Sequence, residues 1–276
     1  RRGKRRKRAE TGKKTGRRNM RSAVYNIWDS AEGMPLRFEQ IVGEIRRVEA
    51  DVICLQETAD ERQLKELMQR CGYPYFCPAL PDGGEWSGTG ILSRYPLAEL
   101  QRYPYAAAAL LCVEEKKILV INVHLPWDGA LKRERAIVDI AEQAAGIQAD
   151  YAFLAGDFNC SEHSAVHRFL KGEQSLMERE TSWFDLAEAY AECTGQAASA
   201  TLNFRNNPRW NPPGGTSTNT IETNQRFDRI LLKNPYPAAF PLLKDCGIFG
   251  TEVSDRTGLS ASDHYGVYAE LEFGEG

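Results

Sequence analysis

The chain has 276 residues, of which 42% are hydrophobic and 26% are charged, so it has enough apolar material for a globular core in one large or two medium domains. No apolar run reaches the roughly 18 residues of a membrane span, and no signal-peptide core precedes the first expected strand. The seven cysteines include no pair at C-x-x-C spacing, which favours reduced cysteines in an intracellular, cytoplasmic protein over a disulfide framework.

The net charge of −3 hides a strong asymmetry along the chain. Residues 1–19 carry eleven Lys or Arg and one Glu, a net charge of +10, whereas residues 20–276 carry −13. The basic head has little to bury and is expected to be disordered. Three interpretations remain open for it: a tether to nucleic acid or an anionic membrane, a localisation signal, or a segment that is not native to the protein, because Met20 directly precedes the first expected strand.

After the head, apolar runs of strand length alternate with stripes of helical spacing, and no linker divides the body into two domains. Two longer segments lack such a pattern: residues 73–86 are expected to form a surface loop around an edge strand, and residues 193–226 a long polar loop of functional or mobile character. In chain order the pattern predicts a strand over 21–28, a helix over 36–49, a strand over 51–57, a helix over 61–70 capped by Gly72, strands over 88–94, 108–114 and 118–124, a helix over 131–148, a strand over 152–155, helices over 164–170 and 184–192, and strands over 226–232 and 265–273.

Polar residues recur where these strands begin or end. Asp157 and Asn159 follow a buried apolar strand one residue apart, and residues i and i+2 of an extended chain point to the same side. Asp228 stands among apolar residues, where a carboxylate without a partner would be costly. Each residue alone has an ordinary structural interpretation as a turn or cap, but eight of them on six strands favour a shared site. The candidate residues are Asn26, Glu57, His124, Asp157, Asn159, Asp228, Asp263 and His264.

The residue types in this set indicate hydrolytic chemistry. Carboxylates and amides without a Cys/His cluster favour a hard cation such as Mg²⁺ or Mn²⁺ over zinc. The two histidines with acidic partners supply acid–base capacity near neutral pH. The chain has no Gly-x-Ser-x-Gly elbow, P-loop or G-x-G-x-x-G motif, which weakens acyl transfer and nucleotide-dependent kinase chemistry. Cleavage of a phosphoester by water remains.

The ordered motifs resemble those of the endonuclease/exonuclease/phosphatase superfamily, which includes deoxyribonuclease-like nucleases, abasic-site endonucleases, tyrosyl-DNA phosphodiesterases, deadenylases, inositol-polyphosphate phosphatases and neutral sphingomyelinases. The resemblance runs from about residue 21 to 273 and implies an α+β fold, a four-layer αββα sandwich in which helices flank two packed mixed β-sheets. The matching motifs are Tyr25-Asn26-Ile27, Leu55-Gln56-Glu57, Gly90-Ile91-Leu92-Ser93-Arg94, Val123-His124-Leu125, Gly156-Asp157-Phe158-Asn159, Arg226-Phe227-Asp228-Arg229 and Ser262-Asp263-His264.

The resemblance also implies roles for the site residues. Glu57 would be the principal ligand of Mg²⁺, for which Mn²⁺ can substitute, with Asn26 and Asp263 close to the metal and Asn26 near the bound phosphate. Asp157 would orient or deprotonate the attacking water, while Asn159 would hold a phosphate oxygen. In the last pair, Asp228 would fix the tautomer of His264, which would stabilise the developing charge with help from His124.

One position departs from the pattern of the nuclease members. They commonly carry Asn-x-Asp on the first strand, whereas this chain has Asn26-Ile27-Trp28-Asp29, so Trp28 occupies the place of the acid. An aromatic residue there is similar to the sphingomyelinase-like members. Arg226-Phe227-Asp228-Arg229 and Asp245-Cys246-Gly247, in contrast, resemble the tyrosyl-DNA phosphodiesterase subgroup. The two indications conflict, so the subgroup stays open.

Three hypotheses for function follow. The first is a Mg²⁺-dependent phosphodiesterase or nuclease that acts on nucleic acid, with Trp86, Trp127, Phe204 and Trp210 available either to stack on bases or to pack within loops. The second is a phosphatase or phosphodiesterase for a lipid headgroup or another small phosphoester, which the acidic body and Trp28 favour. The third is a catalytically silent scaffold of the same fold, which the complete set of eight site residues disfavours. The oligomeric state does not follow from the sequence.

Overall fold

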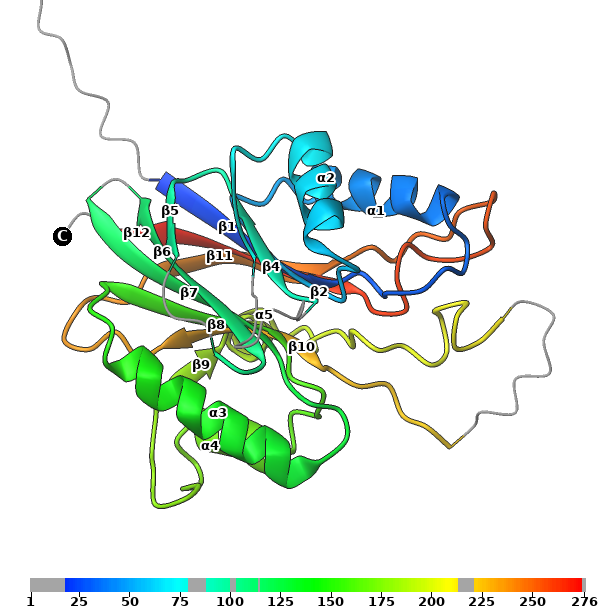
Figure 1. The fold of residues 1–276 in the computed structure, drawn as a ribbon. Coiled ribbons are helices and arrows are strands. Elements are labelled where there is room, and N and C mark those ends of the chain that lie inside the picture. Colours follow the sequence, from blue (N-terminus) through cyan, green and yellow to red (C-terminus); the bar gives the residue numbers. More distant parts are fainter. Residues whose placement is uncertain (1–17, 79–87, 100–102, 114, 213–220, 275–276) are drawn as a thin grey trace, which may run out of the picture.

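The computed structural model describes residues 18–78, 88–99, 103–113, 115–212 and 221–274. In this part of the chain, two six-stranded sheets pack face to face, with helices on their outer surfaces (Figure 1). The first sheet has the order β11-β12-β1-β2-β4-β3 and contains β1 (Arg18–Asn26), β2 (Val52–Gln56), β3 (Tyr75–Pro78), β4 (Gly90–Ser93), β11 (Leu242–Phe249) and β12 (Gly266–Phe273). The second has the order β5-β6-β7-β8-β10-β9 and contains β5 (Leu97–Glu99), β6 (Ala106–Val113), β7 (Lys116–His124), β8 (Tyr151–Asp157), β9 (Trp183–Asp185) and β10 (Asp228–Lys233).

The helices form the outer layers of the sandwich. Figure 1 shows α1 (Leu36–Arg47) and α2 (Glu61–Cys71) over the first sheet, and α3 (Ala130–Ala145) and α4 (Ala165–Leu170) over the second. A further helix, α5 (Leu186–Thr194), packs against β9, β10 and β11 and so joins the two sheets at one side. No helix in the described part of the chain is long and apolar enough to cross a bilayer.

The apolar side chains are distributed over three interfaces, as the layers require. Between the sheets lie residues such as Val24, Val120 and Phe153, all fully buried. Ile41 of α1 packs on the first sheet, and Ile137 of α3 packs on the second. The strands β2 and β8 are buried along their whole length, because both of their faces are covered in this way. A strand in that position needs a near-continuous apolar run, which is what the sequence has there.

The strand directions bring the polar strand ends to one end of the sandwich. The strand β1 runs parallel to β2, and β7 parallel to β8, and the contact between Asn26 and Asp157 shows that the carboxyl ends of all four strands meet there. The strand β10 is antiparallel to β8 and begins at this end, with Asp228 opposite Asp157 in the register. Because β12 is antiparallel to β1, its preceding residues Asp263 and His264 also lie at this end.

The predicted αββα architecture is confirmed, and most expected elements occur within a few residues of their predicted bounds. Gly72 caps α2 in the left-handed conformation, as expected. The first strand begins at Arg18, so the end of the basic head belongs to β1, whereas residues 1–17 lie outside the described residues. The edge strand expected within 73–86 is β3; the rest of that loop, including Trp86, largely lies outside the described residues.

Three strands escaped prediction, and each has a physical reason. Two of them, β5 and β9, have only three residues, too few for a periodic pattern. The third, β11, contains a shift in pairing register between Leu243 and Asp245. An extra residue in one strand reverses the alternation of side chains, so the period-2 signal disappears from the sequence.

Candidate active site

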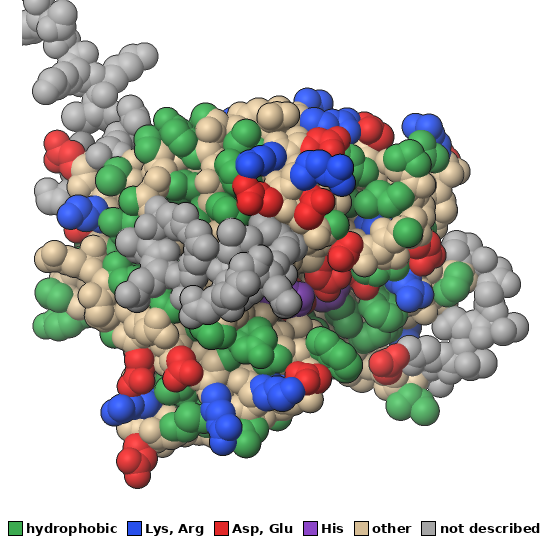
Figure 2. All heavy atoms as spheres, viewed as in Figure 1, with side chains coloured by type: hydrophobic (Ala, Val, Ile, Leu, Met, Phe, Trp, Pro, Cys, Tyr) green, Lys and Arg blue, Asp and Glu red, His purple; other side chains and the backbone are tan. Residues whose placement is uncertain are grey.

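All eight predicted site residues lie at the same end of the sandwich. Figure 2 shows histidine side chains beside acidic side chains in the hollow between the two layers of this face. Asn26 connects the two sheets, because its amide nitrogen donates to Glu57 Oε1 at 2.9 Å and to Asp157 Oδ2 at 3.1 Å. His124 completes this group: its Nε2 lies 4.0 Å from Glu57 Oε1 and 3.8 Å from Asp157 Oδ2.

Asp157 lies at the centre of the site and is almost completely buried, with 1% of its surface exposed. Its Oδ2 accepts the hydrogen bond from Asn26, while its Oδ1 accepts the backbone N–H of Asn159 at 2.8 Å. The side-chain amide of Asn159 donates to the carbonyl of Leu125 after β7. Each strand end is therefore tied to its neighbour by a side chain that was predicted to act in the site.

The backbone is unusual at several of these positions. Glu57 and Asn159 have φ angles of 56° and 48°, in the left-handed region that residues other than glycine seldom adopt. Such conformations cluster at functional sites, where surrounding contacts hold them. At Gly156, a Cβ atom would lie 2.0 Å from the carbonyl oxygen of Val123 on β7. Glycine thus lets β8 approach β7 closely, directly before Asp157.

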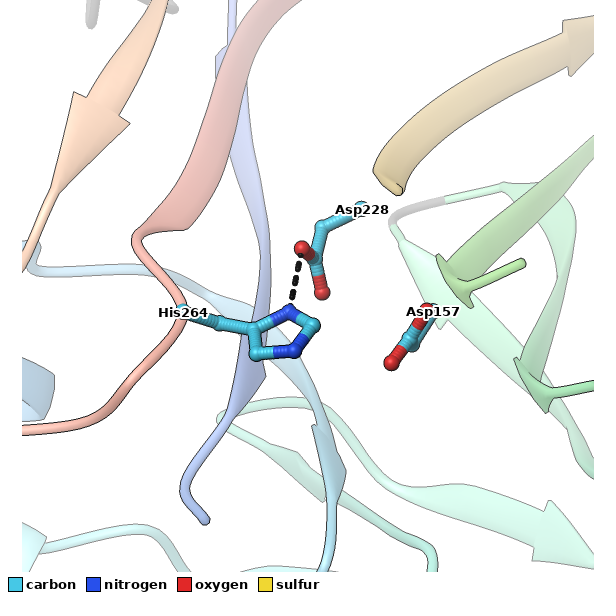
Figure 3. Close-up of side chains that lie close together, drawn as sticks. All are labelled: Asp157, Asp228 and His264. Carbon is cyan, nitrogen blue, oxygen red and sulfur yellow. Dashed lines mark hydrogen bonds and ion pairs between the residues drawn. The ribbon is translucent and has the colours of Figure 1, made fainter. Parts of the chain in front are cut away.

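The second feature of the site is a buried Asp–His pair. The Nδ1 of His264 lies 2.8 Å from Oδ2 of Asp228, and Figure 3 shows the imidazole between the carboxylates of Asp228 and Asp157. Burial disfavours the charged imidazole, but the charge and hydrogen bond of Asp228, with the charges of Asp157 and Asp263, outweigh burial and raise the pKa of His264 to about 10. These contacts favour the imidazolium form of His264, which donates hydrogen bonds.

Supporting contacts, which sequence reasoning missed, fix this pair. The hydroxyl of Ser262 donates to the carbonyl of Asn26 at 2.6 Å and accepts the N–H of His264 at 3.2 Å. The hydroxyl of Thr201, within the long polar loop, accepts the backbone N–H groups of Phe227 and Asp228. These residues act on backbone groups, which no side-chain pattern reveals. The sequence signal was indirect: Ser262 stands within the Ser-Asp-His motif.

The long loop over 193–226 proves to be part of the support for the site. Asn207 is fully buried and donates to the carbonyl of Ser262 at 2.9 Å. The indole N–H of Trp210 donates to the carbonyl of Asp263, also at 2.9 Å. Phe204 is 7% exposed and packs against Trp210 with ring centroids 5.3 Å apart, so these two aromatics pack the loop. Trp127, in contrast, is 81% exposed beyond the end of β7.

The donor set fits a divalent cation. Glu57, Asp157, Asp228 and Asp263 bring four carboxylates together against one imidazolium and His124. Burial raises the pKa of Asp263 to about 6, and the negative charges of Glu57 and Asp228 add to that effect against the attraction of His264. A cation of charge two would relieve this repulsion, and carboxylate oxygens are its preferred ligands. The amide nitrogen of Asn26 faces the carboxylates of Glu57 and Asp157. The amide oxygen of Asn26, Oδ1, accepts the backbone N–H of Trp28 at 3.0 Å.

Two groups of acidic and histidine side chains in the described residues have ligand atoms within 4.8 Å of one another. One is Asp157, Asp228 and His264, described above. The other is His167, Asp185 and Glu188, into which Arg226 projects at 2.8 Å from Asp185 and 3.1 Å from Glu188. Because a guanidinium already neutralises both carboxylates, this second group is a buried ion-pair network.

A carboxylate-rich centre with a histidine held by Asp228, at one end of two packed mixed sheets, is an arrangement suited to the hydrolysis of phosphoesters. The chain matches the model of the Endonuclease/Exonuclease/phosphatase family over residues 23–264. It therefore belongs to this family. The resemblance inferred from the motifs is thus confirmed at the level of the family.

Comparisons with individual proteins support this assignment. The human protein "Protein angel homolog 2" is 25% identical over 230 residues, which are 70% of this chain and 40% of that protein. The chain therefore spans less than half of the length of that relative. The fold is similar to D. rerio TDP2 complexed with a single strand DNA product, with a TM-score of 0.72, 18% identity, and coverage of 92% of this chain and 99% of that one. It is also similar to an endonuclease/exonuclease/phosphatase from Bacteroides vulgatus, with a TM-score of 0.68, 18% identity, and coverage of 93% and 100%.

Proposed function

We propose that the chain cleaves phosphodiester bonds in nucleic acid, as a nuclease or an end-processing enzyme, by attack of water on phosphorus. The observation that carries the proposal is the position of Asp157 beside the His264 imidazolium that Asp228 holds, at 2.8 Å between Nδ1 and Oδ2. A buried carboxylate and a fixed cation next to each other can respectively handle the water and meet the growing charge on phosphate oxygens.

The pKa of His264 decides how these two residues divide the work. Burial lowers the pKa of His264, but the surrounding carboxylates raise it to about 10. His264 would therefore act as a hydrogen-bond donor to a phosphoryl oxygen. Asp157 is then the group that orients or deprotonates the water. His124 is partly exposed and lies beside the carboxylates of Asp157 and Glu57, so it would add a second donor to phosphate. Asn159 has a second amide hydrogen besides the one given to Leu125, and it would hold a phosphate oxygen.

We assign the cation site to Glu57 and Asp263, with Mg²⁺ as the ion and Mn²⁺ as a substitute. When bound, the cation would polarise a phosphoryl oxygen and the leaving group. Asn26 lies next to it and orients Glu57 through the 2.9 Å hydrogen bond to Oε1; its own oxygen accepts the N–H of Trp28 and keeps a second lone pair that would face the cation. The backbone N–H of Asp29 holds the other oxygen, Oε2, at 3.0 Å.

Two observations support nucleic acid as the substrate. The similar structure of D. rerio TDP2 was solved with a single strand DNA product. In this chain, Trp127 is 81% exposed beyond the end of β7, where a base could stack on its ring.

We also propose that residues 20–276 form one catalytic domain. The +10 charge of residues 1–19 would add non-specific attraction to a polyanion. All seven cysteines are free, which supports an intracellular, cytoplasmic location.

The second candidate is a phosphatase or phosphodiesterase for a lipid headgroup or other small phosphoester. It is favoured by the net charge of −13 on residues 20–276, which repels a polyanion, and by Trp28 in the place of an acid. This candidate predicts activity that needs no polymer.

The experiment that separates the two candidates compares three substrates. A 5′-labelled oligonucleotide, single- and double-stranded, is incubated with enzyme and Mg²⁺ beside bis(4-nitrophenyl) phosphate and a choline phosphodiester lipid. EDTA and the variant Asp157→Asn serve as controls. Cleavage of the oligonucleotide that both controls abolish supports the proposal. Hydrolysis of the small diesters beside an intact oligonucleotide would refute it and favour the second candidate.

A further inference from the structure

An arginine with little else to bind stands at the rim of the active site. The guanidinium of Arg209 lies 5.3 Å from the ring centroid of Trp28 and 5.4 Å from that of Trp210. Its side chain is 43% exposed, and its ion-pair partner in the described part of the chain is Glu32, at 4.0 Å and itself 50% exposed. Such an exposed pair contributes little, so the N–H groups of Arg209 are available to a ligand.

Arg37 shows what a purely structural arginine looks like in the same place. It also packs on Trp28, at 4.5 Å, but it is fully buried and donates five hydrogen bonds to backbone carbonyls. Two of those carbonyls belong to Ile27 and Trp28 itself. Arg37 thus fixes the left-handed backbone of Trp28, at a φ of 59°, and leaves the indole as a rigid support for Arg209.

Hydrogen bonds connect this rim to the catalytic residues. The N–H of Trp28 donates to Oδ1 of Asn26, and the indole N–H of Trp210 donates to the carbonyl of Asp263. The two tryptophans that hold Arg209 are therefore hydrogen-bonded to Asn26 and Asp263 of the candidate active site, Trp28 through its backbone and Trp210 through its indole.

The chemistry of Arg209 selects a phosphate. A guanidinium stacked on aromatic rings loses little conformational entropy on binding, and it keeps the planar N–H pairs that match phosphate oxygens. Residues 20–276 carry a net charge of −13, and the weakly paired guanidinium of Arg209 places a positive group at this rim. We propose that Arg209 binds a phosphate next to the scissile one and so selects substrates with at least two phosphates, as in a polynucleotide. This inference rests on the proposed function.

The test measures binding of labelled single-stranded DNA by fluorescence anisotropy in EDTA, so that the strand stays intact. Arg209→Ala should weaken binding about tenfold at 0.1 M salt and reduce the slope of log K against log salt by about one. Arg209→Lys should keep the slope and lose part of the affinity, because the charge remains without the planar stack. Arg179→Ala, which removes an exposed arginine paired with Glu142 on the α3 side, is the matched control and should bind like the wild type.

A second measurement locates the phosphate. Neutral methylphosphonate groups replace the phosphates of the strand one at a time. One replacement should weaken wild-type binding but leave binding by Arg209→Ala unchanged, because the partner of that phosphate is already absent. Two results would overturn the inference while the proposed function stands. One is that Arg209→Ala binds DNA with the same affinity and salt slope as the wild type. The other is that each methylphosphonate replacement weakens binding by Arg209→Ala as much as binding by the wild type. A wild type that does not bind DNA would refute the proposed function and the inference together.

Discussion

The Nδ1 of His264 lies 2.8 Å from Oδ2 of Asp228, within a pair that is almost completely shielded from solvent. The carboxylate keeps the ring in one orientation and keeps it charged. Asp228→Asn is nearly isosteric but removes the negative charge, so the pKa of His264 should fall. We expect kcat for the phosphodiester to decrease by about 10² to 10⁴ with a smaller change in KM. NMR titration of His264 measures the shift, and an unchanged pKa with unchanged kcat would refute the role of Asp228.

The ion-pair network behind the site makes a prediction about stability and pH. Burial works against ionisation of Glu188, but hydrogen bonds from His167 and Lys171 and the charge of Arg226 lower its pKa from 4.5 to about 2. A lowered pKa stabilises the fold fully above the unfolded value and progressively less as the pH falls from 4.5 toward 2.

Glu188→Gln should therefore reduce the free energy of unfolding by about 1 to 2 kcal/mol at pH 7, since the side chain is one-third exposed. The difference from wild type should shrink between pH 5 and pH 3. Urea unfolding at several pH values measures this. A constant difference across that range would show that the charge of Glu188 does not stabilise the fold.

Gly156 makes a prediction about the close approach of β7 and β8. A methyl group there would lie 2.0 Å from the carbonyl oxygen of Val123, at a φ of 142°. Gly156→Ala should lower the free energy of unfolding by about 3 kcal/mol or more, since backbone atoms must move. Gly43→Ala is the control: it lies within α1 with no atom within 4 Å of the added methyl, and should stabilise by about 0.5 to 1 kcal/mol. Similar effects of the two changes would contradict this account.

Trp127 allows a test of base stacking that leaves the core intact. Because its side chain is 81% exposed, Trp127→Ala should not change the melting temperature. It should weaken single-stranded DNA binding by about 1 to 3 kcal/mol if one base stacks on the indole. Tyr236→Ala removes an equally exposed aromatic, 83% exposed, beyond the opposite end of β10 and should leave binding unchanged. Equal binding by both variants would remove Trp127 from the substrate site.

The sequence was sufficient to predict that the polar strand ends would meet. The parallel pairs β1–β2 and β7–β8 place Asn26 and Asp157 at one end, because buried apolar strands linked by helices have few other arrangements. The pairing of Asp228 with His264 followed from the motif resemblance. These predictions depended on the order and type of the elements, which long apolar runs and helical stripes specify well.

What the sequence could not provide are contacts made through the backbone. Thr201 supports Asp228 by accepting N–H groups, and Ser262 by its hydroxyl ties the last strand to the carbonyl of Asn26. Such contacts require the three-dimensional path of a loop without periodicity. The position of Arg209 between Trp28 and Trp210 was hidden for the same reason, since the three side chains come from segments about 180 residues apart.

The catalytic role of Asp157 can be tested most directly on β8, because this strand has a carboxylate at each end. Asp157 is the last residue of β8, at the active site, and Asp150 precedes β8 at the opposite end, where its carboxylate accepts the N–H of Lys117. The measurement is the single-turnover rate of oligonucleotide cleavage in Mg²⁺ for the wild type, Asp157→Asn and Asp150→Asn. We expect a loss of at least about 10³-fold for Asp157→Asn and no change for Asp150→Asn. Cleavage by Asp157→Asn at the wild-type rate would contradict it.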